Sequence, residues 1–413
     1  MVKKVVIVGA GIAGINAIKA IREKDSEVPI DLVSDEPFFP YNRMKLSKGL
    51  FELELSDNLL QKKEWYAQNR VNLLLGEAVR KIDVRSQTVT LHHGAKLEFD
   101  KLLIATGALN REPELSAAGE PRLYTLRKMN DARQVLAHID RAGQVVHIGG
   151  GIQGLETAWA LRQHRKKVTI TEIQARLMPF QLDEKGSDLL QHLAEDSGVE
   201  VITGSPVVGM EQTSVQIGAG KSIPCDMAIY SIGIIPNLAI VDDTGIRTNR
   251  GILVNERMET NLPHIYAAGD VAEYDGKIFG LWNIAVEQGK TAGYNLIGHP
   301  ASYRPVVPVT TLRGFDITLF SMGDVDESHA SHSVVHEDIS KNTYIRVFIQ
   351  NNRISGAIMI GDTGKSPLLK SAIEKQTLLE DISWNQITVE DLFQTLKTDP
   401  KERGTRIEQN SVL

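Results

Sequence analysis

Two glycine-rich turns constrain this chain more than any other feature. The first turn, Gly-Ala-Gly-Ile-Ala-Gly at 9–14, follows the apolar run Val5–Val8 and precedes a helical pattern. The second turn, Gly-Gly-Gly-Ile-Gln-Gly at 149–154, follows a second strand pattern, Val145-Val146-His147-Ile148, and also precedes a helical pattern. A buried strand, a glycine turn and a helix in this order form the phosphate-binding end of a βαβ unit. The sequence therefore predicts an α/β protein with two Rossmann-like dinucleotide-binding domains.

The glycines of these turns are the first candidate binding residues. Gly9 allows the tight turn, Gly11 lets the backbone approach a pyrophosphate, and Gly14 lets the helix pack close to the strand. The free N–H groups and the positive dipole end of the helix then attract the phosphates. The second turn repeats this pattern with Gly149, Gly151 and Gly154.

Acidic residues follow the second strand of each unit, where a carboxylate accepts hydrogen bonds from ribose hydroxyls. After the strand at 30–33 the chain reads Ser34-Asp35-Glu36. Asp35 is our candidate, Glu36 is the alternative, and an ordinary solvated strand end stays open. In the second unit, Glu172 ends a strand at the spacing of about 20 residues that such units use.

Further candidates lie at strand ends and in one basic loop. One basic loop has the sequence Pro40-Tyr41-Asn42-Arg43-Met44-Lys45-Leu46-Ser47-Lys48. Its cations, such as Arg43 and Lys48, could neutralise a pyrophosphate or a reduced flavin. The alternative is an ordinary solvated loop. Thr106 and Gly107 end a strand in small residues, which suits a cofactor lying against the backbone as well as a tight turn.

Two later positions complete the set of candidates. Asp270 follows a glycine at a strand end, where a carboxylate is well placed to bind a polyol chain. Trp282 begins a predicted helix, and it is either a core aromatic or a cofactor contact. From Thr311 the pattern changes to short strands and a helix of about Pro367–Leu379, which indicates a separate C-terminal α+β domain.

Composition limits the function classes. A formal net charge of −6 argues against nucleic acid as a partner. No apolar run is long enough to span a membrane, and the N-terminus does not resemble a secretion signal, so we expect a cytoplasmic protein that does not bind membranes. The single cysteine, Cys225, excludes an intramolecular disulfide, a redox-active cysteine pair and a cysteine-ligated cluster. We assign no metal site.

The motifs together resemble a known family. GAGIAG, PYNRMKLSK, ATG, GGGIQGLE, GIIPN, AAGDVAE and WNIAVEQG occur in the order seen in the FAD-dependent pyridine nucleotide–disulfide oxidoreductases. The basic loop and the later GAIMIGDTG are most similar to NADH:rubredoxin and NADH:ferredoxin reductases and to the flavin half of the NADH-dependent nitrite reductase large subunit.

This resemblance implies FAD and NADH as cofactors and assigns roles to the candidates. FAD would lie on the first glycine turn, and NADH on the second, with Glu172 on its ribose and Glu156 near the nicotinamide. Lys48 and Glu156 would be the catalytic residues. The other FAD contacts would be Asp35, Arg43, Lys48, Thr106, Gly107, Asp270 and Trp282, and Gly233 would be a further nucleotide contact.

The resemblance also implies a domain order. Residues 1–112 and 243–310 would form two parts of an FAD domain, with an NAD domain at 113–242 between them. An interface domain at 311–395 and a mobile tail at 396–413 would follow, in a monomer or a homodimer.

The chain departs from the family in ways that affect function. Ser34 and Met44 replace a common glutamate and proline, and the region between Glu36 and Phe51 holds no sulfur nucleophile. We therefore expect an enzyme that passes electrons from NADH through the flavin to a small redox protein such as rubredoxin or ferredoxin. The alternatives are a flavin module of a nitrite-reducing assembly and a flavoprotein redox sensor that responds to NADH.

Overall fold

The computed structural model describes residues 2–52, 55–117, 122–380, 382–384 and 386–397. These residues fall into two compact units, each built from three stretches of chain. Unit 1 consists of Met1–Glu112, Leu126–Arg133 and Ile232–Val306, and unit 2 of Pro113–Thr125, Gln134–Ser231 and Val307–Leu413. The domain boundaries expected from the sequence stay a prediction.

Unit 1 is built on a parallel sheet with the strand order β20-β7-β1-β2-β3. The strands are β1 (Val5–Val8), β2 (Ile30–Ser34), β3 (Val71–Leu75), β7 (Lys101–Ile104) and β20 (Ile265–Ala267). All four residues of β1 are buried because both faces of the sheet are covered by apolar clusters. A fully apolar run such as β1 is what a strand with two covered faces requires.

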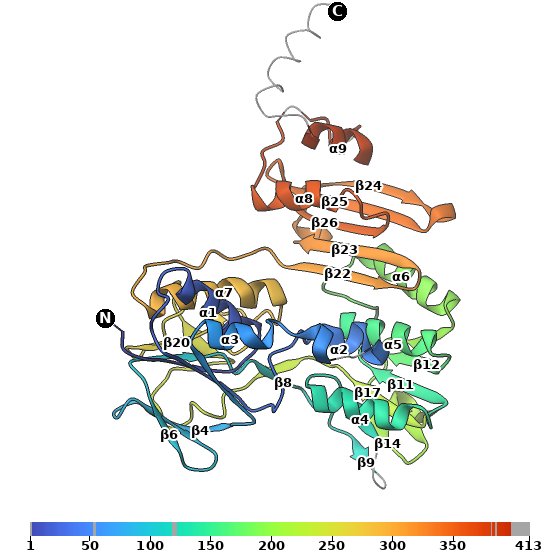
Figure 1. Ribbon diagram of the computed structural model, residues 1–413. Coiled ribbons are helices and arrows are strands. Elements are labelled where there is room, and N and C mark those ends of the chain that lie inside the picture. The colour runs from blue at the N-terminus through green and yellow to red at the C-terminus, as the bar shows by residue number, and fades with distance from the viewer. Residues whose placement is uncertain (1, 53–54, 118–121, 381, 385, 398–413) are drawn as a thin grey trace, which may run out of the picture. The chain divides into compact units, whose positions relative to one another are not determined.

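Two helices cover one face of this sheet and pack closely on each other. They are α1 (Ile12–Arg22) and α7 (Trp282–Leu296), which lie side by side in Figure 1. Their close approach depends on small residues, because a Cβ at Gly289 would lie 2.3 Å from the Ala13 carbonyl oxygen. The late segment of the chain is thereby held against its first helix.

The remaining elements of unit 1 are short. An antiparallel sheet is formed by β4 (Val79–Asp83), β5 (Thr88–Leu91) and β6 (Lys96–Glu98). Two-stranded pairs are formed by β8 (Ala108–Asn110) with β18 (Ile234–Pro236) and by β19 (Ile252–Val254) with β21 (Ala272–Tyr274). The helices are α2 (Lys45–Lys48), α3 (Lys63–Gln68), η1 (Leu50–Glu52) and η2 (Leu55–Asn58).

Unit 2 repeats the parallel arrangement with the order β10-β17-β11-β12-β13. Its strands are β10 (Leu123–Thr125), β11 (Gln144–Ile148), β12 (Lys167–Thr171), β13 (Val199–Ile202) and β17 (Met227–Tyr230). A second sheet joins β9 (Ser116–Ala117), β14 (Val207–Met210), β15 (Ser214–Ile217) and β16 (Lys221–Pro224). The helices are α4 (Met129–Ile139), which begins in unit 1, α5 (Ile152–Gln163), α6 (Glu184–Asp196) and η3 (Gly218–Gly220).

The C-terminal part of unit 2 is an antiparallel sheet of order β22-β23-β26-β25-β24, drawn in orange to red in Figure 1. It comprises β22 (Val309–Gly314), β23 (Ile317–Gly323), β24 (His332–Asp338), β25 (Thr343–Gln350) and β26 (Arg353–Gly361). The helices α8 (Ser366–Glu374) and α9 (Val389–Lys397) share an apolar core with this sheet. The short turns η4 (Glu327–His329) and η5 (Ile339–Lys341) adjoin its strands.

The predicted fold class is confirmed, with two parallel α/β sheets and a C-terminal antiparallel sheet. None of the helices in the described ranges is long and apolar enough to cross a bilayer. Two local expectations differ from the structure. The helix expected at 367–379 ends at Glu374, and α9 was not expected. Of the tail expected to be mobile, 398–413 lies outside the described residues.

Candidate functional site

The two glycine turns have nearly the same backbone geometry. Gly9 has φ +113° and Gly149 has φ +112°, in the region that favours glycine. A Cβ at Gly9 would lie 2.1 Å from the Ala105 carbonyl oxygen, and one at Gly149 would lie 2.4 Å from that of Ser231. Each turn is therefore pressed against the end of a neighbouring parallel strand.

The later glycines of each turn differ from the first in what surrounds them. A Cβ at Gly14 or at Gly154 would lie 2.3 Å or 2.1 Å from the carbonyl oxygen of the first glycine of its own turn. At Gly11 and Gly151, by contrast, a Cβ would meet no described atom within 4 Å. These two residues precede the first turn of α1 and α5, so each helix N-terminus has an open space beside it, which suits a pyrophosphate.

A cavity lies beside the first turn, within unit 1. Several strand ends and loops supply its lining. Predicted residues that line it are Gly9, Gly11, Asp35, Arg43, Thr106, Gly107 and Asp270. Segments far apart in the sequence thus meet where the carboxyl ends of β1, β2, β7 and β20 converge, which is where ligands bind in open parallel sheets.

Two basic residues that the sequence analysis missed also line this cavity. Arg127 forms an ion pair with Asp270 at 2.7 Å, and Lys128 forms one with Asp35 at 2.6 Å. Asp131 accepts hydrogen bonds from both of their backbone N–H groups. The sequence signal is a basic pair, Arg127-Lys128, just before a helix.

The alternative ribose candidate, Glu36, has a different place. It is buried, and its carboxylate accepts hydrogen bonds from the Tyr41 hydroxyl and the Arg43 guanidinium, both at 2.8 Å. Burial raises the pKa of Tyr41, so this hydroxyl keeps its proton and stays a donor. Glu36 therefore fixes the basic loop, whereas Asp35 reaches the cavity.

The other candidates of unit 1 lie on well-defined elements. The Thr106 hydroxyl donates to the Asn237 carbonyl at 2.9 Å, and the Asn237 N–H donates to the Gly107 carbonyl at 2.9 Å. Lys48 is an exposed residue at the end of α2, and Trp282 is the half-buried first residue of α7. Their cofactor contacts stay predictions.

Glu172 stands beside the second glycine turn in unit 2. Glu172 is 9% exposed, and its carboxylate accepts hydrogen bonds from the N–H of Gly150 at 2.7 Å and of Gln174 at 2.8 Å. Glu156 is buried on α5. Gly233, with φ +108°, falls within unit 1. Their contacts with a nucleotide also stay predictions.

A buried histidine contacts the second glycine turn. His147 on β11 is fully buried, and its Nδ1 lies 3.2 Å from the Gly149 carbonyl oxygen. A Cβ at Gly154 would lie 2.9 Å from the same Nδ1. Burial lowers the pKa of His147 to about 4, so the ring is neutral at neutral pH.

The environment of the single cysteine does not favour its action as a nucleophile. Cys225 lies just before β17 and is 2% exposed. Burial raises the pKa of its thiol to about 11, and the thiolate is the reactive form. It does not line the cavity beside the first turn.

Comparison with known proteins identifies the family. The family described as pyridine nucleotide-disulphide oxidoreductase matches residues 3–289, and the rubredoxin NAD+ reductase C-terminal domain matches residues 308–377. The chain belongs to the pyridine nucleotide-disulphide oxidoreductases. The resemblance inferred from the sequence motifs is confirmed, and the chain is an oxidoreductase of a family that binds FAD and NADH.

Individual relatives agree with this assignment. The chain is 33% identical to the NADH-rubredoxin oxidoreductase of Clostridium acetobutylicum, over 92% of this chain and 97% of that protein. It is 32% identical to the nitrite reductase [NAD(P)H] of Bacillus subtilis, over 92% of this chain but only 48% of that protein, so it spans about half of that relative. The solved covalent putidaredoxin reductase–putidaredoxin complex contains a chain that matches with a TM-score of 0.86 and 25% identity, over 96% of this chain and 99% of that one.

The buried His147 generates a prediction about pH. The pKa of His147 is lower in the folded than in the unfolded state. Its contribution to the free energy of unfolding is therefore fully present above about pH 6.5 and is lost as the pH falls toward 4. The loss amounts to about 3 kcal/mol at most, at roughly 1.4 kcal/mol for each pKa unit. The drop in thermal midpoint between pH 7 and pH 4.5 should be smaller in a His147→Gln variant than in the wild type.

Acidification affects many other groups, so the comparison needs a matched control. His299 is exposed, and a His299→Gln variant should retain the wild-type pH dependence. If both variants lose stability in parallel with the wild type, His147 does not carry the proposed linkage.

Proposed function

We propose that the chain passes electrons from NADH through FAD to a small one-electron carrier protein such as rubredoxin or ferredoxin. The observation that carries the proposal is the cavity beside the first glycine turn, whose described lining contains no cysteine. A disulfide reductase needs a thiol at its flavin, and this cavity offers none.

The residues of unit 1 fit FAD. The open space at Gly11 suits a pyrophosphate, and the cations Arg43, Arg127 and Lys128 at the cavity suit its charge. Asp35 and Asp270 are acceptors for hydroxyl groups, and each is held in place by a cation. When bound, FAD supplies a hydride acceptor that returns electrons one at a time.

The lack of an accessible thiol favours a direct electron transfer to another protein. Cys225 is buried and has a raised pKa, so it forms neither a mixed disulfide nor a sulfenate readily. A protein that accepts single electrons is the acceptor class that needs no such intermediate.

Surface charge near the cavity supports an acidic carrier. Arg43 lines the cavity, and the exposed Lys45 and Lys48 follow it on α2. Met44 between them is 40% exposed. Cations around an exposed apolar side chain attract small acidic proteins, and salt weakens that attraction.

The match to half of a nitrite reductase favours a second candidate function. The chain would then be the NADH and flavin module of a larger assembly. Because one cysteine cannot ligate an iron–sulfur cluster, the nitrite-reducing centre would lie outside these 413 residues. The cytoplasmic location, the redox-sensor alternative and the oligomeric state stay predictions.

We expect NADH to be preferred over NADPH because of Glu172. Its buried carboxylate would accept ribose hydroxyls but repel a 2′-phosphate. A Glu172→Arg variant should move the ratio of kcat/KM values toward NADPH by about tenfold or more, or roughly 1.4 kcal/mol. Steady-state assays with both nucleotides measure this ratio.

Two further variants separate charge from structure in this test. Glu172→Gln keeps an acceptor oxygen for Gly150 and should weaken the preference only in part. Glu195→Arg, at an exposed position on α6, should leave it unchanged. A wild type that prefers NADPH would show that the role given to Glu172 is wrong.

The electron acceptor is tested by reducing the protein with NADH under anaerobic conditions and mixing it with candidate oxidants separately. Rubredoxin or ferredoxin should reoxidise the flavin much faster than a small disulfide or oxygen does. Faster reoxidation by the disulfide or by oxygen than by every redox protein would contradict the proposal.

A charge reversal on α2 adds a matched comparison. Lys45→Glu should slow reoxidation by an acidic carrier and reduce its dependence on salt. Lys19→Glu, exposed on α1, changes the net charge equally and should have a smaller effect. Equal effects would show that the carrier does not dock at α2.

A further inference from the structure

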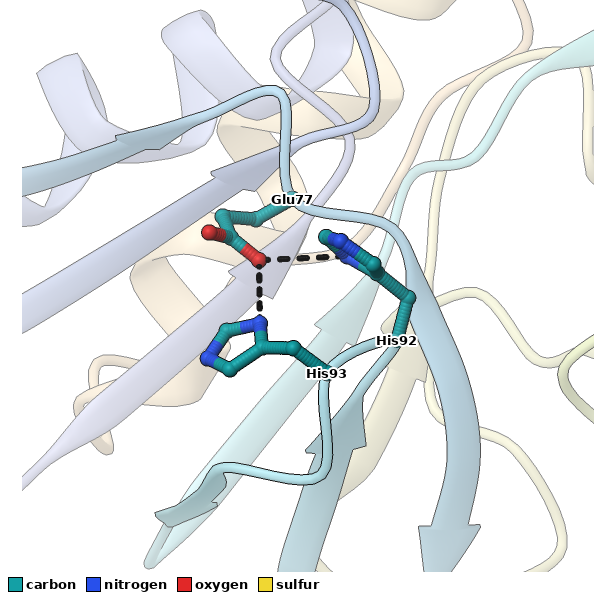
Figure 2. A group of neighbouring side chains, drawn as sticks. All are labelled: Glu77, His92 and His93. Carbon is teal, nitrogen blue, oxygen red and sulfur yellow. Dashed lines mark ion pairs between the residues drawn. The ribbon is translucent and has the colours of Figure 1, made fainter.

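Two adjacent histidines and a glutamate converge in unit 1, outside the residues assigned to either nucleotide. Figure 2 shows the rings of His92 and His93 turned toward the Glu77 carboxylate. Their Nδ1 atoms lie 3.2 Å and 2.9 Å from the Glu77 Oε2. One atom from each of the three residues falls within 4.8 Å of the others.

Hydrogen bonding does not explain this convergence. The Glu77 Oε2 is buried, and it has no hydrogen-bond partner of acceptable geometry among the described residues. The two N···O distances are therefore short enough for ion pairs, but their geometry is not that of aligned hydrogen bonds. A buried carboxylate oxygen without a well-aligned hydrogen bond is poorly compensated for its loss of water, and a cation between the three atoms would compensate it.

The backbone holds these residues in place. Glu77 donates its N–H to the Ser34 carbonyl at 2.7 Å, and His92 donates its N–H to the Ala78 carbonyl at 2.8 Å. His93 follows in the turn between β5 and β6, where the Gly94 N–H donates to the Leu91 carbonyl at 2.9 Å.

We propose that Glu77, His92 and His93 form a binding site for a divalent transition metal ion of the Zn²⁺ class. Two imidazoles and a carboxylate are a donor set that Zn²⁺ favours. In a tetrahedral site with bonds of about 2.0–2.1 Å, ligand atoms lie roughly 3.3 Å apart, and the two N···O distances are close to this value. About half of each histidine side chain is exposed, which leaves the fourth position to water or an external ligand.

The site adjoins the cofactor cavity. Glu77 and the next two residues, Ala78 and Val79, line that cavity. A metal ion bound between Glu77 and the β5–β6 turn would tie this part of the lining to the antiparallel sheet. We therefore expect the ion to stabilise the folded protein, because it binds the folded arrangement better than the unfolded chain.

The test is a calorimetric titration of the FAD-loaded protein with Zn²⁺ in the presence of excess Mg²⁺, together with thermal unfolding with and without Zn²⁺. The wild type should bind one Zn²⁺ per chain at this site and unfold at a higher temperature with it. A His92→Gln/His93→Gln double variant should bind at least tenfold more weakly and lose the thermal shift, and so should Glu77→Gln.

Controls distinguish a built site from general surface binding. His299→Gln removes an exposed histidine elsewhere and should retain both signals, and flavin absorbance confirms that each variant is folded. Equal Zn²⁺ binding by the wild type and the double variant would overturn the proposal. An equal loss in His299→Gln would also overturn it. The outcome does not depend on the identity of the electron acceptor.

Discussion

The contact between a glycine turn and the carbonyl end of a neighbouring strand is the constraint on which both strand–turn–helix units depend. At Gly9 and Gly149, the position of a Cβ is taken by a carbonyl oxygen at 2.1 Å and 2.4 Å, and the backbone has a positive φ. A larger residue would move the turn away from the sheet and shift the helix N-terminus behind it. The open space at Gly11 and Gly151 exists because this contact fixes where each helix begins.

Features that depend on local pattern were predictable from the sequence. An apolar run, a glycine turn and a helical pattern specify β1 and α1, because burial on both faces leaves no polar position in the strand. The same turn and helical pattern specify β11 and α5, although β11 contains one fully buried polar residue, His147. The carboxylate at the end of β12 was also predictable, because its distance from the turn is set by one βαβ crossover.

Features that depend on long-range pairing were not predictable. Nothing local indicates that Arg127 pairs with Asp270, or that Lys128 pairs with Asp35, because these partners meet only through the sheet order. The sequence likewise left Glu36 open as an alternative to Asp35. The structure separates them, because the hydroxyl of Tyr41 and the guanidinium of Arg43 hold Glu36 in a buried position. Glu77 and the two histidines are brought together in the same way, by strand pairing.

Because Cys225 is buried with a raised pKa, we expect the flavin, and not this thiol, to take up the two electrons of NADH. The most direct test is an anaerobic titration with NADH, followed by flavin absorbance, in the wild type and in Cys225→Ser. We predict complete reduction by one NADH per FAD in both proteins. A second equivalent consumed by the wild type but not by Cys225→Ser would contradict this prediction, because it would show that Cys225 is held as an oxidised sulfenate that takes up two electrons and becomes the thiol.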